Sequence, residues 1–580
     1  MIFLACALYL WLLGAAAFGR WKAWRSPFRA PWLGYAVLVA CLQIAHLFTP
    51  IDSAFSWKFL ALSSIGAAGI LAFRFRTIVF RMRRTQQIVL SLYVAAFLSV
   101  AWLAFGPAFN LSTQPIVHYD VGYYYLETIR WLISFPIVPG LGNLLLNLAF
   151  NQSPFLIASF FDSLGVHLWG YFLLGAIMPW LGLTLSGFAL LQGLFSLLAI
   201  RRRITPREKA YAISLPAWIY TLLSNNISSN SPDIPSACLQ IHLFLCFASF
   251  LARKDTKALI TEFSELVVLG ALSLTIKLNS VFFVTAILLL AAIVVWRRIG
   301  RQLLTSKQMQ YVLLATAILF LPWLARGIIL SGYPLFPLTI LGAPVPWRIP
   351  PSEVSHFYDI TVYWARQPFY DLAKVQSGFA WVPEWLERIR VMKDQFTRPM
   401  ILSILWTLLL IAFAWKSGTL RRVSSRFLLL FAPVVFSLLM WFLSAPEPRY
   451  LGSITWLLPL VAPLVVISET VHGAIVFMAL TFLLDYIVLG NLRYNTEWAW
   501  KRRAPSFPEI RKVEILEATN QYGVSLHYPK RGDQTFDAEL PSTRSLHPFL
   551  LLLNETKGLA GGFRDARVDD HGKQRQHHTD

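Results

Sequence analysis

The chain is a succession of apolar runs, each close to the length that crosses a lipid bilayer, and this pattern constrains the fold more than any other feature. Only 14% of the 580 residues are charged, against about 25% in a soluble domain. The chain therefore cannot cover a water-facing surface, which excludes soluble, fibrous and disordered proteins. We expect an all-α polytopic membrane protein with about fourteen (about 12–14) transmembrane helices. The expected helices lie near residues 2–18, 31–48, 57–73, 87–105, 180–200, 209–223, 236–252, 263–277, 280–296, 310–326, 399–415, 427–444, 450–467 and 473–489, and residues 154–180 are either an interfacial helix or an extra hairpin.

Short clusters of Lys and Arg separate the apolar runs and predict the orientation of the chain. Cytoplasmic loops are enriched in these residues, and placing every cluster in the cytoplasm is consistent with the alternation of the runs. The net charge of +21 is therefore a topology signal, and no binding to nucleic acid is expected. The clusters lie at residues 20–29, 74–84, 201–209, 253–257, 297–307 and 416–426.

This orientation places the N-terminus and the longest polar segments on the extracytoplasmic side. The first apolar run precedes its basic residues, which predicts a membrane span and not a cleaved signal peptide. We expect a transmembrane domain at 1–489 with external loops 106–179 and 327–398, an external appendage at 490–565 and a disordered tail at 566–580.

The densest group of polar and aromatic side chains surrounds Asp120 in the first long external loop. Asp120 begins a helix-like run, DVGYYYLETIRWLISF, and is followed by a Pro/Gly segment, FPIVPGLGNL, that predicts a structural turn. The aspartate is either the N-cap of the helix or a carboxylate that faces a cavity as an acid–base group or metal ligand. Nearby Tyr and Trp side chains would partly remove it from water, which favours a base.

Asp233 and Lys277 interrupt apolar stretches at the same predicted membrane face. Asp233, in SNNISSNSPDIPS, is either a helix cap in an ordinary hairpin loop or a second carboxylate facing Asp120. A Lys at the bilayer centre costs about 2.5–3.5 kcal/mol, so Lys277 either extends to the interface or binds an anion such as a lipid phosphate.

Arg326 and Arg449 end apolar runs on the side that disfavours basic residues, so a local partner is expected for each. Glu447 is the expected partner of Arg449. The alternative partner is phosphate, because the guanidinium fork matches two oxygens.

Sequence signatures of soluble enzymes and of metal sites are absent. The chain contains no Walker P-loop, GxGxxG, GxSxG or HExxH motif. Its four cysteines lie inside apolar runs without CxxC or Cys/His spacing, so neither a disulfide framework nor a zinc site is indicated.

The arrangement of spans, external loops and Asp120 resembles the GT-C superfamily of membrane glycosyltransferases. A closer similarity is to a family of uncharacterised bacterial multi-pass proteins, and it extends from about residue 115 to about residue 565. Its most specific piece is IVPGLGNL. The other matching stretches are YDVGYYYLETIRWLISF, FNQSPF, SSNSPDIP, LTIKLNS, RGIILSGYPLFP, VPWRIP, APEPRYLG, DAELPSTRSLHPFLLL and GLAGGF.

GT-C membership implies that a sugar moves from a polyprenyl-phosphate donor to a glycan, lipid or protein acceptor outside the plasma (inner) membrane of a bacterium. Asp120 would be the catalytic base. A divalent metal ion between Asp120 and Asp233 is an option that the spacing does not support; no other cofactor is expected. The expected substrate-binding residues are Tyr124, Tyr125, Arg130, Asp233, Lys277, Arg326, Glu447 and Arg449.

The chain departs from the pattern of that bacterial family near the expected site. A Tyr-His pair follows the aspartate in the pattern, where this chain has Tyr124 and Tyr125. A His and an Arg follow the VPGLGNL piece, where this chain has Leu145 and Asn147. The family's substrate, and its activity, therefore need not carry over unchanged.

Two other classes of membrane protein share parts of this pattern. A polymerase or ligase of lipid-linked saccharides would rely on external arginines, here Arg348, Arg366, Arg388 and Arg390. A transporter or flippase would need charges within spans, for which Asp485 is the acidic candidate.

The orientation can be tested with reporter fusions. Fusions after Arg203, Arg298 and Arg422 should report the cytoplasm, and fusions near Asn230, Pro351 and Asp533 the opposite side. If positions 230 and 351 report opposite sides of the membrane, the predicted external loops cannot form one common site.

Overall fold

The structure is a computed structural model, and it describes a defined part of the chain. The described residues are 2–19, 26–75, 84–116, 118–165, 169–197, 204–223, 227–367, 375, 378–416, 418, 420–467 and 509–567. The expected span at 473–489 with Asp485, the first part of the expected appendage up to residue 508, and the tail from residue 568 lie outside these residues.

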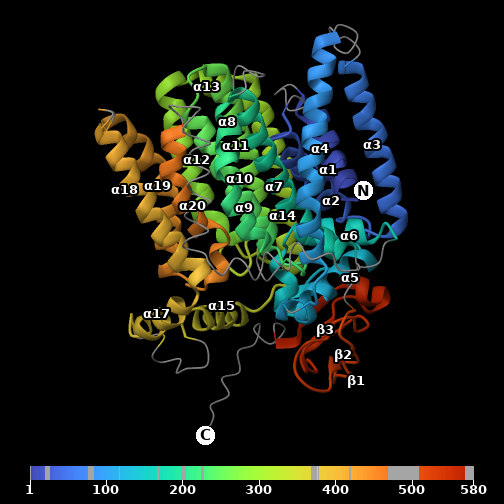
Figure 1. Cartoon of the computed structure of the whole chain (residues 1–580). Coiled ribbons are helices and arrows are strands. Elements are labelled where there is room, and N and C mark those ends of the chain that lie inside the picture. Colours follow the sequence, from blue (N-terminus) through green and yellow to red (C-terminus); the bar gives the residue numbers. More distant parts are fainter. Residues whose placement is uncertain are drawn as a thin grey trace.

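A bundle of long apolar helices forms most of the described chain (Figure 1). Within the described residues, nine helices are long and apolar enough to cross a membrane, and three shorter apolar helices accompany them. The predicted helical membrane architecture is therefore confirmed, while the number fourteen stays a prediction. The long helices are α3 (Ser53–Phe75), α4 (Arg84–Ser112), α7 (Trp169–Leu197), α10 (Asp233–Leu251), α11 (Thr256–Ile276), α12 (Val281–Ile299), α14 (Lys307–Ser331), α18 (Arg398–Lys416) and α19 (Leu420–Leu443), and the shorter ones are α1 (Ile2–Ala17), α2 (Ala30–Ala45) and α20 (Ile454–Ile467).

The expected span at 209–223 is not one helix. Helix α8 (Pro206–Ile213) ends at Ser214, and α9 (Leu215–Leu222) continues the path. Pro216 lies in the first turn of α9, where it has no N–H to donate to the preceding helix and its ring clashes with the preceding turn. The open stretch 154–180 contains a short separate helix, α6 (Pro154–Asp162), before α7 begins at Trp169.

The long predicted loops gather at one end of the bundle, here called the loop end (Figure 1). The short helix α13 (Gln302–Thr305) lies at the opposite end, here called the basic end, next to Arg297 and Arg298 of α12. The loop-end helices are α5 (Leu126–Ser134), α6, α15 (Pro351–Arg366), α17 (Val382–Val391), the π-helices η4 (Val121–Tyr125) and η8 (Lys393–Thr397) and the 3-10 turns η5 (Leu141–Asn143), η6 (Leu146–Phe150), η7 (Leu278–Ser280) and η9 (Pro448–Leu451).

Helices α1 and α2 cross at van der Waals distance because glycines lie at the crossing. A Cβ at Gly34 would lie 1.7 Å from the Leu10 carbonyl oxygen, and one at Gly14 would lie 2.0 Å from the Ala30 oxygen. Small residues permit this close approach between transmembrane helices. Helix α2 ends at Ala45, and the carbonyl oxygen of its C-cap His46 accepts from Ile137 N of the first long loop at 2.9 Å.

The appendage contains β-structure, so the expectation of an all-α chain is incomplete. Strands β1 (Ile515–Thr519) and β2 (Ser525–Pro529) form one antiparallel pair, with Glu517 opposite His527. Strands β3 (Leu550–Leu552) and β4 (Phe563–Asp565) form another, linked by the 3-10 turn η10 (Glu555–Gly561). The apolar alternation in these short strands was too weak to indicate them in the sequence.

The appendage binds the segment that contains Asp120. Thr535 N and Phe536 N both donate to the Gly122 carbonyl, at 2.8 and 2.9 Å. The fit is close, because a Cβ at Gly122 would lie 2.7 Å from the Phe536 ring. On the neighbouring turn of the chain, Ser542 N donates to the carboxyl group of Glu127 at 3.3 Å.

Glu127 should make this docking depend on pH. Its side chain is 1% exposed, and burial raises its pKa to about 7, although Trp131, Ser542 and Arg130 oppose the shift. A raised carboxyl pKa stabilises the folded state fully below its ordinary value near pH 4.5 and loses that stabilisation as pH rises through about 7. The loss is on the order of 3 kcal/mol for this shift.

Hydrogen exchange of residues 535–543 between acid and alkaline pH measures this effect. After division by the intrinsic, base-catalysed exchange rate, the protection of these amides should fall between about pH 4.5 and 7 in the wild type. In Glu127→Gln, which keeps the acceptor oxygen, the protection should not change over this range. Glu514→Gln is the matched control, because Glu514 pairs with Lys530 on the appendage surface. An unchanged pH profile in Glu127→Gln would contradict the assignment.

Candidate functional site

Two carboxylates and two cations meet at the loop end, here called the Asp120–Arg449 cluster. Asp120 immediately precedes η4, Asp233 begins α10, Lys277 follows α11, and Arg449 lies in η9. The Nε of Arg449 donates to Asp233 Oδ2 at 2.7 Å, while its Nη2 binds Asp120 Oδ2. Lys277 Nζ binds the other oxygen of Asp233. The sequence hypothesis that Asp233 faces the same site as Asp120 matches this geometry.

The tip of the α11–α12 hairpin positions Arg449. Asn279 Nδ2 donates to the Tyr450 carbonyl oxygen at 2.5 Å, and the Lys277 ammonium lies 5.3 Å from the Tyr450 ring centroid. Gln240 of α10 accepts from Ser453 N at 2.9 Å and donates to Ser280 at 3.2 Å. Buried polar groups without partners are costly, so these bonds fix the 449–453 segment against the hairpin.

Asp120 does not act as a helix cap through its side chain. It occupies the N-cap position of η4 with helical φ and ψ of −64° and −16°, and it makes no capping hydrogen bond. Its Oδ2 instead accepts from the Tyr125 hydroxyl at 3.3 Å, and that hydroxyl lies 3.4 Å from Ser231 Oγ. The N-cap interpretation is therefore wrong. The π-helical turn of η4 brings Tyr125 back to Asp120 across five residues.

Both ends of the Asp120–Arg449 pair stay accessible. The side chains of Asp120 and Arg449 are 17% and 32% exposed. Within the described residues, Asp120 Oδ1 and Arg449 Nη1 have no hydrogen-bond partner, so each has an atom left for a ligand.

His118 supplies a neutral ring beside these charges. It stacks on Tyr125 with ring centroids 5.6 Å apart. Burial and the nearby Arg449 lower the pKa of His118 to about 4, so the imidazole is uncharged at neutral pH.

The cluster does not fit a divalent metal between Asp120 and Asp233. The guanidinium of Arg449 already bridges one oxygen of each carboxylate. The two negative charges are balanced by Arg449 and Lys277, and a divalent ion would have to displace a cation that both carboxylates bind. Arg449 and Lys277 thus supply the positive charge that a metal ion would have supplied to the two carboxylates.

Three of the predicted substrate-binding residues have other contacts. Arg130 binds the carbonyl oxygens of Asp537 and Ala538 and so anchors the appendage. Tyr124 is 4% exposed, and its ring packs against those of Tyr125, Phe150 and Phe155. Arg326 hydrogen-bonds to His46 and Asn151, away from Asp120.

The expected pair between Glu447 and Arg449 does not form. Glu447 lies 3.4 Å from Arg388 of α17. Arg449 turns instead toward Asp120 and Asp233, whose side chains are 17% and 6% exposed, against 28% for Glu447.

The external arginines that would favour a polymerase or ligase are partly engaged by the fold. Arg366 donates to the carbonyl oxygens of Leu443 and Ser444 and lies 5.2 Å from the Trp381 ring centroid. Arg388 donates to the Ala365 carbonyl at 2.5 Å, besides its contact with Glu447. These contacts join α15 and α17 to the bundle.

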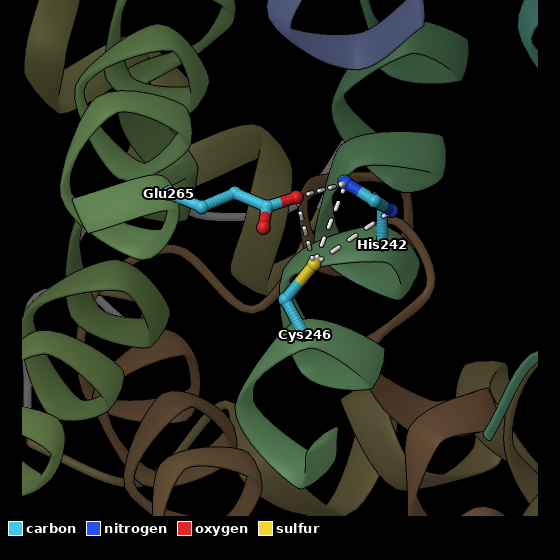
Figure 2. Close-up of side chains that lie close together, drawn as sticks. All are labelled: His242, Cys246 and Glu265. Carbon is cyan, nitrogen blue, oxygen red and sulfur yellow. Dashed lines mark hydrogen bonds and ion pairs between the residues drawn. The ribbon is translucent and has the colours of Figure 1, made fainter. Parts of the chain in front are cut away.

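A second polar cluster lies inside the bundle, and the sequence hypotheses missed it. In the described part of the chain, His242, Cys246 and Glu265 are the one group of potential ligands close enough together to hold a metal ion (Figure 2). The Cys246 sulfur lies 3.4 Å from His242 Nε2, and Glu265 Oε1 lies 3.9 Å from the same nitrogen. His242 and Cys246 are one turn apart on α10, a spacing that could have indicated the pair.

This cluster does not fit a metal either. Both Glu265 oxygens accept from Arg207, at 2.6 and 2.8 Å, and Arg29 Nε lies 3.0 Å from Oε2. Two guanidinium groups beside the carboxylate oppose a cation there. The cluster ties the start of α2 to α8, α10 and α11, and its buried charges are paired, so these particular charges give no support to a transporter.

Ser231 and Tyr450 are contacts of the cluster that sequence reasoning also missed. Ser231 was one of many hydroxyl groups in its loop, and Tyr450 was distinguished only by its position next to Arg449. Both act through packing between segments remote in sequence, which no local pattern encodes.

Comparison with known proteins gives one match. The family model described as "Domain of unknown function (DUF8201)" matches residues 1–456, which include every residue of the Asp120–Arg449 cluster. The chain therefore belongs to this family. No curated protein matches the chain, and no solved structure matches it.

Proposed function

We propose that the chain is a membrane glycosyltransferase that uses the Asp120–Arg449 cluster. In this proposal a polyprenyl-phosphate donor gives its sugar to a glycan, lipid or protein acceptor on the extracytoplasmic face of a bacterial inner membrane, with the N-terminus on that face. The observation that supports it most is an accessible aspartate beside two cations where the bundle meets the long loops. A base and a phosphate-binding pair are the two groups that such a transfer needs.

The proposed reaction is a single displacement at the anomeric carbon. The acceptor hydroxyl gives its proton to Asp120 Oδ1, its oxygen bonds to the anomeric carbon, and the bond from that carbon to the phosphate oxygen breaks. The sugar is thereby transferred with inversion, and polyprenyl phosphate leaves. Phosphate is a good leaving group, so cationic stabilisation replaces a general acid, unlike in hydrolases that need two carboxyl groups.

Arg449 and Lys277 are the proposed phosphate ligands. Their carboxylate partners keep them oriented in the absence of donor, and Arg449 Nη1 is free for an oxygen. A phosphate that draws Arg449 away would also release Asp120 Oδ2 from its ion pair. The base would then be strongest only when the donor is present.

The rings of Tyr119 and Tyr123 are the candidates for stacking on a sugar. Tyr124, Tyr125 and Trp131 are buried, whereas Tyr119 is 52% exposed and lies 5.7 Å from Tyr123 between ring centroids. Aromatic faces suit the apolar face of a sugar ring.

Asp120→Asn should abolish most transfer without unfolding the protein. An amide cannot take the hydroxyl proton, and general-base catalysis contributes about 10²–10⁴-fold. Membranes that carry native acceptors would be given a labelled polyprenyl-phosphate hexose, and release of polyprenyl phosphate would be measured. Asp52→Asn is the matched control, because Asp52 does cap a helix, accepting from Phe55 N at 2.7 Å, and Asn caps equally well. Normal transfer by Asp120→Asn would refute the assigned base.

Arg449→Lys should lower transfer at least about tenfold, because an ammonium group cannot replace the two directed guanidinium bonds. The same release assay, with membrane expression scored in parallel, measures the loss. Arg298→Lys is the control, since Arg298 donates to the Arg253 carbonyl at the basic end of the bundle. Equal activity of the two variants would remove Arg449 from the proposed phosphate site.

A further inference from the structure

Arg326 lies in a buried pocket that is separate from the Asp120–Arg449 cluster. Its side chain belongs to α14 and is 3% exposed. Nε donates to Asn151 Oδ1 at 3.1 Å, and Nη1 donates to His46 Nδ1 at 2.7 Å. Asn151 is itself fixed by hydrogen bonds in both directions with Trp323, at 2.7 and 2.8 Å.

The charge of Arg326 is not balanced by its surroundings. A guanidinium group has no acceptor, so His46 Nδ1 must accept, and the neutral ring carries its proton on Nε2, which is buried and has no hydrogen-bond partner among the described residues. Across the residues that the structure describes, no carboxylate forms an ion pair with Arg326. This contrasts with Arg207 and Arg449, whose charges meet carboxylates. An unpaired buried charge is strongly unfavourable.

Arg326 borders a cavity of about 30 Å³, enough for two or three water molecules or for one small ion in their place. Its Nη2 group has no protein partner in the described chain. The Gln152 side chain also lines the cavity, and its buried Oε1 has no partner. Because the amide can rotate to present its NH₂ group, Gln152 can serve as a second donor. Leu148, Leu156 and Leu330 contribute apolar walls.

We propose that this cavity binds a phosphate-type oxyanion through Arg326. The two Nη groups of a guanidinium match two oxygens of a phosphate, and the anion would neutralise the unpaired charge. Arg326 lies five residues from the end of α14 at the loop end, a depth that a lipid headgroup or a free ion can reach. Phe155 lines the cavity, and its ring centroid lies 5.2 Å from that of Tyr125, whose hydroxyl donates to Asp120, so two packed rings stand between the cavity and Asp120. The site therefore does not rest on the proposed glycosyl transfer.

Thermal unfolding of the full chain in phosphatidylcholine nanodiscs tests the site. Inorganic phosphate, titrated at constant ionic strength, should raise the Tm steadily with the logarithm of its concentration once that concentration exceeds the Kd. A second arm replaces part of the phosphatidylcholine with phosphatidylglycerol and omits free phosphate. A shift in the first arm assigns the site to a free ion, a shift in the second to an anionic headgroup, and either supports the proposal.

Arg326→Gln should abolish the shift, whereas the control Arg298→Gln should keep it. Arg326→Lys retains the charge and should weaken the apparent affinity for phosphate by about tenfold or more. This variant tests the proposal if Arg326→Gln does not fold. Native mass spectrometry of the wild type gives a readout that needs no variant, because it detects retained phosphate or phosphatidylglycerol. No shift in either arm, an equal shift in Arg326→Gln, or an equal shift with chloride would overturn the proposal. None of these results depends on Asp120 or on transfer activity.

Discussion

The guanidinium group of Arg449 joins three segments that are hundreds of residues apart in the chain. It binds Asp120 from the first long loop and Asp233 from the start of α10, and Lys277 completes the charge balance. Breaking such a pair leaves an uncompensated buried charge, which is far costlier than the pair is stabilising. In the absence of a ligand, these contacts therefore hold the hairpin tip, the 449–453 segment and η4 together.

The loop end is built in layers above this cluster. The segment around η4, α5 and η5 covers the bundle, and the appendage binds on top of it (Figure 1). The VPGLGN turn packs directly against the appendage. Gly140 has a φ of +65°, and a Cβ there would lie 2.1 Å from the Phe563 carbonyl oxygen. Asn143 donates to the carbonyl groups of Gly140 and Trp347, at 3.2 and 2.9 Å. The glycine at position 140 thus meets a requirement for a positive φ and close backbone packing, in keeping with the prediction of a structural turn.

Buried charge occurs in two forms, and they differ in what they leave for a ligand. Around Glu265, guanidinium groups and carboxylates satisfy one another, so the cluster stabilises the arrangement of helices. Around Arg326, the protein supplies a neutral imidazole and an amide. The positive charge of Arg326 is therefore not balanced, and its Nη2 has no hydrogen-bond partner among the described residues. The Asp120–Arg449 cluster is intermediate, because it is neutral but has unpaired atoms on both partners. Charge balance, more than residue type, separates the structural positions from those proposed to bind a ligand.

The sequence alone determined the membrane class, the positions of most helices and the side of the bundle on which polar loops gather. These follow from hydropathy and charge, which act locally along the chain. It also singled out Asp120, Asp233, Lys277 and Arg449, because polar groups at the ends of apolar runs are conspicuous. Only the tertiary structure decided that these four meet while Arg326, Arg130 and Glu447 do not. Which carboxylate an arginine pairs with depends on the packing of helices remote in sequence, and no local periodicity carries that information.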